Sequence, residues 1–531
     1  MRRAYPLLRA SAATALAVTF AACTTDWPAF RYNSLRTAVQ VNASALSNPA
    51  KVPALAVKWR FPKVGDPDIG GFRASPVVWK GRVFIGNGNG RLYALDANTG
   101  VPLWQFPLPA DPPLTSQFTC NPSSFGIASS AVIATIAGVD AVIFAAPDQS
   151  VGTGLGEGRL FALNTATGAV IWKSPVIARV TGLTNGSTTQ FHENLGYSAP
   201  IVVGNTVYVG IGNHCDNPIQ KGRVAAVDLA TGALVGGFSY CSTGTCADST
   251  RGGGVWSPVA GWGNALYVTT GNTRSGAATE PMPNRGLSLL RLDAATGAVA
   301  WQFQPVPWAL DTDPDWSAPP TVMFASCGSV IVSTQKDGWT HALDDMGTRR
   351  WTFPPATIPF TPGDGTVHND TRYMRGGAAW GDVYIAMNGG LNVTTNVSAG
   401  YKRLHAFNVC AAPTDRVRWL IDVPNASGAT YSLGPPTVTR GIVYVGTDQG
   451  RVVAIADPSL VPPAGFRCIN PDVTTANCVS MGYTLVPEPA VLANVPVTGS
   501  MVYTEPAIAN GKLYVSTGGF GSPGYVYMLS P

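Results

Sequence analysis

The sequence predicts an all-β fold, an eight-bladed β-propeller of four-stranded antiparallel blades, and two observations support this prediction. The first is composition: the 531 residues include 59 Gly and 43 Pro, and 12% are charged against 45% hydrophobic. Such a chain favours many short strands joined by tight turns over long helices. The second is a repeated phrase of Gly-Arg, an alternating strand, Asp or Asn, a Thr-Gly turn and a strand carrying Trp.

The clearest copies of the phrase run from Gly90 to Trp104 and from Gly158 to Trp172. Alternation with a period of two residues predicts half-buried antiparallel strands, and the glycine of the Thr-Gly pair suits a turn that needs positive φ. The tryptophan at a fixed offset is expected to pack between neighbouring sheets. A unit that cannot bury its own faces and recurs roughly every 40–65 residues predicts a propeller.

The predicted blades cover almost the whole chain. They lie near residues 72–104, 125–172, 195–238, 253–303, 317–353, 374–421, 432–490 and 500–530. The last copy ends before a tryptophan strand, but Leu55 to Phe61 contains one. We therefore expect this N-terminal strand to complete the last blade and close the ring, with seven blades as the alternative to eight.

The first 22 residues resemble an export signal. Three arginines (Arg2, Arg3 and Arg9) precede an apolar, alanine-rich run that is too short to span a bilayer. The residues that end it, Phe20 to Cys23, resemble a bacterial lipobox in which Cys23 receives the lipid; ordinary signal cleavage nearby is the alternative. We expect a periplasmic protein that a lipid anchors to the outer membrane, with residues 23–50 as a linker and 51–531 as a single propeller domain.

The net charge of the chain argues against some classes of binding partner. Without the signal, 35 basic against 30 acidic residues become 32 against 30, so the formal charge falls from +5 to +2. No block of Lys and Arg remains to follow a phosphate backbone, which argues against a nucleic-acid partner.

Eight cysteines besides Cys23 suggest up to four disulfides in an exported chain. Cys241 with Cys246, and Cys468 with Cys478, are close enough in the sequence to close local loops. The remaining four cannot be paired from the sequence: Cys120, Cys215, Cys327 and Cys410.

The repeated phrase, Ala-x-Asp-x-x-Thr-Gly-x-x-x-Trp, resembles the tryptophan-docking repeat of quinoprotein dehydrogenases, whose eight-bladed propellers bind pyrroloquinoline quinone (PQQ). Similar repeats occur in non-catalytic propellers, including the lipoprotein of the outer-membrane barrel-assembly machinery. The repeat therefore supports the fold, whereas function has to be argued from a site.

The segment from Gly252 to Pro320 resembles the site-forming part of PQQ alcohol dehydrogenases. It holds a Trp after a Gly cluster, a Thr-Gly-Asn at a strand end, and an Asp-x-Asp before a Pro-rich strand start. The resemblance implies that Trp256 lies against the quinone ring, that Asn272 binds Ca²⁺ and that Asp313 is the catalytic base. Asp315 would be a second Ca²⁺ ligand or a residue that organises the site.

Three further residues follow from the same resemblance. Lys336 stands where these enzymes carry a Lys or Arg that bonds the quinone oxygens. Trp380, in Gly-Gly-Ala-Ala-Trp-Gly, resembles an element of the polyvinyl-alcohol-dehydrogenase-like members and would contact the cofactor. Asp216 would substitute for the acidic Ca²⁺ ligand of the third blade. The chain lacks an adjacent Cys-Cys pair and a haem-binding motif, so a separate cytochrome would accept the electrons.

These residue types suit one chemistry. An ortho-quinone accepts hydride, a hard cation polarises the quinone carbonyl, and a carboxylate takes the proton of the alcohol. The sequence thus predicts PQQ- and Ca²⁺-dependent oxidation of a small or polymeric alcohol. The alternative is a non-catalytic propeller that acts as a periplasmic or outer-membrane binding scaffold. In that case Trp256 and Trp380 would be inter-blade core, Lys336 a solvated loop residue and Asn272 a turn residue. The aspartates would cap turns or bind a structural Ca²⁺.

Overall fold

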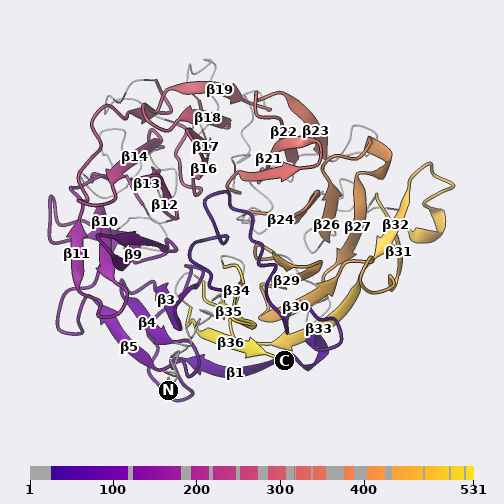
Figure 1. Ribbon diagram of the computed structural model, residues 1–531, viewed down its shortest axis with the longest axis horizontal. Coiled ribbons are helices and arrows are strands. Elements are labelled where there is room, and N and C mark those ends of the chain that lie inside the picture. Colours follow the sequence, from indigo (N-terminus) through magenta and orange to yellow (C-terminus); the bar gives the residue numbers. More distant parts are fainter. Residues whose placement is uncertain are drawn as a thin grey trace, which may run out of the picture.

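The chain folds into a ring of eight four-stranded antiparallel sheets with almost no helix (Figure 1). The computed structural model describes residues 25–117, 124–180, 193–195, 197–213, 219–244, 246, 252–272, 285–305, 316, 318–336, 339–353, 376–387, 403–424, 433–470, 473–501, 504–519 and 522–531. Among them no helix is long and apolar enough to cross a bilayer. The predicted all-β propeller is confirmed, with eight blades rather than seven.

Each blade is a meander whose strands follow one another from the axis outward. The first four blades are β2 (Val77–Trp79), β3 (Arg82–Gly86), β4 (Leu92–Asp96) and β5 (Pro102–Phe106); β8 (Val132–Ile136), β9 (Val139–Asp148), β10 (Glu157–Asn164) and β11 (Val170–Lys173); β12 (Ile201–Val203), β13 (Thr206–Ile211), β14 (Arg223–Asp228) and β15 (Tyr240–Cys241); and β16 (Ala260–Trp262), β17 (Ala265–Thr269), β18 (Leu289–Asp293) and β19 (Val299–Phe303).

The other four blades complete the ring. They are β20 (Thr321–Ala325), β21 (Gly328–Thr334), β22 (Thr340–Leu343) and β23 (Arg349–Phe353); β24 (Ala378–Trp380), β25 (Val383–Met387), β26 (Arg403–Asn408) and β27 (Val417–Asp422); β28 (Thr437–Thr439), β29 (Ile442–Gly446), β30 (Arg451–Ala456) and β33 (Ala490–Pro496); and β34 (Ala507–Ala509), β35 (Lys512–Ser516), β36 (Val526–Ser530) and β1 (Ala56–Phe61).

Several short elements lie outside the eight blades. The hairpin of β31 (Gly465–Cys468) and β32 (Leu485–Glu488) projects from blade 7, and β6 (Ser116–Gln117) pairs with β7 (Ser124–Phe125). The described residues also form the 3₁₀ turns η1 (Val52–Ala54), η2 (Pro413–Asp415) and η3 (Thr475–Asn477).

The ring closes through the N-terminal strand, as the sequence predicts. Strand β1 pairs antiparallel with β36, from Ala56 opposite Ser530 to Phe61 opposite Val526. The last blade therefore takes one strand from the start of the chain and three from its end.

 Pairing of the two chain ends joins the last blade to the first part of the chain and so closes the ring.

Each strand runs from one face of the ring to the other, and we name the two faces by the connections that they carry. The turn face carries the tight turns between the first and second strands and between the third and fourth strands of each blade. The loop face carries the connections between second and third strands and the connections from one blade to the next. The antiparallel registers fix this assignment, because each strand reverses the direction of the strand before it.

The tryptophan of the repeat docks the blade that carries it onto the next one. The indole N–H of Trp104 in β5 donates to the carbonyl of Thr165 in blade 2 over 3.2 Å, and Trp172 in β11 donates to Leu229 in blade 3 over 3.0 Å. Trp59, Trp301 and Trp351 donate in the same way to Ala97, Asp345 and Val409. The sequence repeat thus becomes a repeated inter-blade contact.

Residues 25–50 are not the linker that the sequence suggested, because residues 25–41 fill the centre of the ring and the residues after them pack onto blade 7 (Figure 1). The chain bonds to the innermost strand of one blade after another, for example at Val78 in blade 1, Val132 in blade 2 and Val438 in blade 7. We call residues 25–41 the central segment. The periodic pattern could not reveal it, since a segment that bonds to the inner strands of several different blades follows no strand period of its own.

Two arginines at the tip of the central segment are fully buried. Arg36 donates from its guanidinium to the carbonyls of Val259, Phe30 and Ala199 over 2.8–2.9 Å. Arg31 forms an ion pair with Glu505, 3.1 Å from Nη1 to Oε2, and also donates to Gly377. Burial lowers the pKa of Arg36 to about 9 and raises that of Glu505 to about 7. The segment is therefore held by contacts to several blades at once.

Three disulfides lie within the described residues. The two local pairs, Cys241–Cys246 and Cys468–Cys478, are confirmed. Cys327 and Cys410, which the sequence left open, form a bond between the turn faces of blades 5 and 6. Cys120 and Cys215 lie outside the described residues.

Candidate functional site

Trp256 and Lys336, two residues predicted to bind the cofactor, meet on the loop face. Trp256 lies in the connection that enters blade 4, four residues before β16, and Lys336 lies in the turn between β21 and β22 of blade 5. The Lys336 ammonium stands over the Trp256 ring, 5.1 Å from its centroid. Both side chains are half-buried. A cation above an indole in a partly desolvated position is a favourable arrangement, and it places a flat surface and a positive charge side by side.

Asn272 belongs to the same neighbourhood through its backbone. Its carbonyl accepts a hydrogen bond from Gly253 N over 2.7 Å, and Gly271 N donates to the Gly254 carbonyl over 2.8 Å. The glycine run before Trp256 is thereby tied to the end of β17. A Cβ on Gly222 of blade 3 would lie 1.9 Å from the Gly253 carbonyl oxygen. This close approach explains why glycines gather at this point in the sequence.

Trp316 connects the two halves of the site. It is fully buried, its carbonyl accepts the hydroxyl of Ser257 over 3.0 Å, and it forms a β-bridge with Gln335. Ser257 follows Trp256 in the chain and Gln335 precedes Lys336. Trp316 therefore fixes the neighbours of both residues.

The turn that carries Lys336 rests on a buried histidine. Gln335 N donates to the Trp339 carbonyl over 2.8 Å and closes the turn. His341 lies 3.0 Å from Gln335 Oε1 through Nε2 and 2.9 Å from Thr352 Oγ1 through Nδ1. Burial, reinforced by Arg349, lowers the pKa of His341 to about 3, so the ring is neutral at neutral pH. A neutral ring can donate to the glutamine oxygen and accept from the threonine hydroxyl.

Four predicted functional residues lie outside the described residues: Asp216, Asp313, Asp315 and Cys23. The connections that contain the three aspartates all join strand ends on the loop face, as do those that carry Trp256, Asn272 and Lys336. Within the described part of the chain, no three His, Cys, Asp or Glu residues are grouped so that they could hold a metal ion. Asn272 remains the one described residue of the predicted ligand set.

Trp380 does not join Trp256 and Lys336, which corrects the prediction that it contacts the cofactor. It is the last residue of β24 and adjoins the β24–β25 turn, so it lies toward the turn face. Its ring packs against the next blade, where a Cβ on Gly441 would lie 2.9 Å from it. The Gly-Gly-x-x-Trp-Gly pattern is here a strand followed by a tight turn, and the tryptophan is inter-blade core.

Several neighbours of the site were not predicted from the sequence. Tyr197 lies edge-on to Trp256, with ring centroids 6.2 Å apart. Trp339 stacks on His341 with an interplanar angle of 18°. Gln335 and Ser257 each adjoin a predicted residue in the chain, and that adjacency was the available signal for them. No comparable signal marks Tyr197, because its approach to Trp256 depends on how blades 3 and 4 pack.

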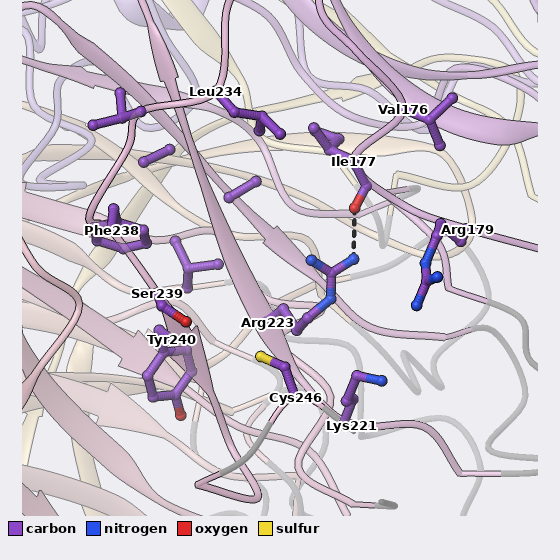
Figure 2. A pocket seen from close by; sticks show the side chains of 14 residues that line it. Val176, Ile177, Arg179, Lys221, Arg223, Leu234, Phe238, Ser239, Tyr240 and Cys246 are labelled. Atoms are coloured by element: carbon purple, nitrogen blue, oxygen red, sulfur yellow. Dashed lines mark hydrogen bonds between the residues drawn. The ribbon is translucent and has the colours of Figure 1, made fainter. Parts of the chain in front are cut away.

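A cavity of about 350 Å³ lies at blade 3 and is separate from the candidate site (Figure 2). Strand β15 has only two residues, and Ser239 N bonds the Thr296 carbonyl of blade 4 instead of β14. The gap left beside β14 is lined mainly by apolar side chains and by three cationic ones, Arg179, Lys221 and Arg223. Arg223 donates to the Ile177 carbonyl over 2.6 Å. Trp256, Asn272 and Lys336 do not line it.

Known structures share this architecture. A quinohemoprotein alcohol dehydrogenase from Comamonas testosteroni is 18% identical, with 95% of this chain and 80% of that chain covered and a TM-score of 0.63. A europium-containing methanol dehydrogenase is 14% identical, with 96% and 98% covered and a TM-score of 0.62. At these identities the similarity establishes the fold alone. No curated protein matches the chain.

The family comparison covers more than half of the sequence. Residues 40–347 match the family described as the glucose/ethanol/alcohol dehydrogenase β-propeller domain, named PQQ. The match includes Trp256, Asn272 and Lys336 as well as the repeats of the first four blades and three strands of the fifth. The chain therefore belongs to the PQQ β-propeller family of glucose, ethanol and alcohol dehydrogenases.

Proposed function

We propose that this protein oxidises an alcohol with bound PQQ and Ca²⁺ and passes the electrons to a separate cytochrome-type acceptor. The observation that carries the proposal is the contact of Lys336 with Trp256 on the loop face, at 5.1 Å. The sequence resemblance names these two residues as the cation and the aromatic surface of a quinone site, and they come from different blades. The family match supports the same chemistry.

The described residues fit a planar, anionic ligand. Trp256 offers an aromatic face, and the ammonium of Lys336 offers a charge that can bond a quinone oxygen. Because the ammonium stands over the ring, a planar ligand stacked on Trp256 requires the lysine to move to the edge of that ligand. Lysine has a flexible four-carbon chain and can make this movement, whereas Trp256 is held between the Gly252–Gly254 run and Ser257.

PQQ, when bound, supplies the hydride acceptor. The chain supplies placement and proton transfer. Asp313 is proposed to take the hydroxyl proton of the alcohol on a carboxylate oxygen, and Asn272, Asp315 and Asp216 are the proposed Ca²⁺ ligands. Asp313 stands three residues before Trp316 in the sequence, and Trp316 is tied to the neighbours of both Trp256 and Lys336. Chain connectivity therefore favours a position close to this cluster.

The substrate is proposed to carry a primary or secondary hydroxyl. The resemblance of residues 313–320 to the polyvinyl-alcohol-dehydrogenase-like pattern supports a polymeric alcohol as one candidate. Primary, secondary and polymeric alcohols should therefore be compared in the same dye-linked assay.

The decisive experiment measures PQQ uptake and turnover separately. The purified protein is reconstituted with PQQ and Ca²⁺, and uptake is measured by equilibrium dialysis before dye-linked alcohol oxidation is assayed. We expect Trp256→Ala to weaken PQQ binding about tenfold or more, because it removes the stacking surface. Asp313→Asn should retain PQQ and slow turnover about 10²- to 10⁴-fold, because it removes the proton acceptor.

Trp380→Ala is the matched control for Trp256→Ala, since the same residue type is removed from the turn-face side of a blade. It should leave PQQ affinity unchanged. Absence of PQQ uptake by the wild-type protein would refute the proposed function and favour the binding-scaffold alternative. Equal turnover of wild type and Asp313→Asn would refute the role of Asp313.

A further inference from the structure

The described chain begins on the turn face. Thr25 exchanges hydrogen bonds with Asn510 in the β34–β35 turn of blade 8: Asn510 N donates to the Thr25 carbonyl over 3.0 Å, and Thr25 N donates to Asn510 Oδ1 over 3.2 Å. Cys23 precedes Thr25 by two residues, which span at most about 7 Å of extended chain. A lipid on Cys23 would therefore be held at the turn face, on the side of the ring away from Trp256 and Lys336.

The same face exposes a pair of large aromatic side chains. Trp262 ends β16 and Phe324 lies near the end of β20, so both adjoin first-to-second-strand turns. Their rings are 5.1 Å apart in an edge-to-face arrangement, yet Trp262 is 55% exposed and Phe324 53% exposed. Met346, in the turn after β22, is 76% exposed on this face. We call these three residues the turn-face apolar patch.

The patch and Thr25 lie on opposite sides of the ring axis. Thr25 contacts blade 8, while Trp262 belongs to blade 4 and Phe324 to blade 5, and Figure 1 shows β34 across the ring from β16. A surface held at one such point alone could tilt freely about it. Contact at two points across the ring aligns the whole face with a flat partner.

We propose that the turn face lies on a lipid bilayer, with the lipid on Cys23 as one contact and the turn-face apolar patch as the other. The proposal rests on the predicted lipidation of Cys23 and is independent of whether PQQ binds. Exposed Trp, Phe and Met side chains suit the boundary between headgroups and acyl chains. The loop face, which carries Trp256 and Lys336, then points away from the membrane and stays open to a soluble acceptor or a bulky substrate.

The test uses the full chain, expressed with its own N-terminus and reconstituted into vesicles of phosphatidylethanolamine and phosphatidylglycerol. The vesicles contain a trace of phospholipid with a photoreactive acyl chain, and cross-linked peptides are mapped by mass spectrometry. We expect cross-links on peptides that contain Trp262, Phe324 or Met346, and none on peptides that contain Trp256 or Lys336. Cross-links on the loop-face peptides instead would overturn the proposal, as would an intact mass without acyl groups on Cys23.

A second measurement isolates the patch from the anchor. A Cys23→Ser protein, which cannot be lipidated, is floated with the same vesicles, alone and with Trp262→Ala and Phe324→Ala combined. We expect the combined substitution to lower the fraction bound about tenfold. Leu108→Ala is the control, because Leu108 is 62% exposed and follows the end of β5, in a connection between blades on the loop face; it should change nothing. Equal binding of all three proteins would remove the patch from the proposal. PQQ uptake, measured in parallel, reports on the proposed function and is expected to be unaffected by these substitutions.

Discussion

Burial inside a blade strongly lowers the pKa of two histidines, His341 and His405. His341 packs against Trp316 and Trp339, and His405 packs between Phe353 and Phe407. Burial is the main cause that lowers the pKa of each to about 3, with Arg349 and Arg403 adding to it. The five histidines are scattered in the sequence without metal-ligand spacing, and in the structure these two are neutral core residues.

Both histidines should make the fold sensitive to mild acid. The unfolded chain takes up protons below about pH 6.5, whereas the folded chain does so only near pH 3, so stability is complete above about pH 6.5 and falls as the pH drops. At about pH 5 the free energy of unfolding should be lower than at neutral pH by about 2 kcal/mol for each histidine. Urea unfolding at about pH 7 and about pH 5 measures it, and His405→Phe should remove about half of the difference. An unchanged difference in His405→Phe would contradict the assignment.

At the scale of the element, one short phrase explains how blades are joined. In Asp96 to Gly100 the aspartate accepts hydrogen bonds from the backbone N–H groups of Asn98 and Thr99, and Gly100 adopts φ +70°. The ring of Trp59 from the preceding blade lies against that glycine, where a Cβ would come within 2.6 Å of the indole. Turn and docking surface are therefore the same few residues, which is why the phrase predicted the blades so well.

Because Gly100 forms both the turn and the docking surface, its substitution should destabilise the fold more than that of a glycine that forms a turn alone. Gly100 and Gly138 both adopt positive φ, at +70° and +81°, but a Cβ on Gly138 would meet nothing within 4 Å. Gly138→Ala should cost only the strain of the turn, about 1 kcal/mol. Gly100→Ala should cost about 2 kcal/mol more, because it also displaces Trp59. Denaturant unfolding of both variants tests this, and equal losses would mean that the docked tryptophan adapts without penalty.

At the scale of the whole molecule, the central segment joins blades that are far apart in the chain. Its bonds reach Val78 and Val132 on one side of the ring and Val322, Ala379 and Val438 on the other. Arg36 adds hydrogen bonds to Val259 in blade 4 and Ala199 in blade 3. A ring of eight blades has a wide centre, and this segment fills it with main-chain contacts rather than with side chains of the innermost strands.

Removing one guanidinium should therefore weaken the whole ring. Arg36→Met takes away the donors that three buried carbonyls use, and we expect a loss of about 3–5 kcal/mol in unfolding free energy. Arg440→Met is the matched control, because Arg440 also bonds the central segment, at the Val41 carbonyl, but is exposed. It should cost less than about 0.5 kcal/mol. Similar losses of unfolding free energy in the two variants would contradict the view that the buried hydrogen bonds of Arg36 stabilise the ring.

The site could be predicted only in part. Trp256 and Lys336 were chosen from the order of motifs, and the structure brings them together. Trp380 was chosen on the same kind of evidence, but its strand ends at the turn face. A local motif specifies a residue type and a neighbouring turn; it does not specify which face of the ring that turn will occupy.

The sequence by itself determined the repeating features: the eight blades, the strand that closes the ring and the two short disulfide loops. Each depends on alternation, turn residues or spacing between residues close in the chain. Only the tertiary structure decided the course of residues 25–50, the Cys327–Cys410 bond across 83 residues and the aromatic patch on the turn face. These features depend on how separate blades pack around one axis, and no periodic signal in the chain encodes such contacts.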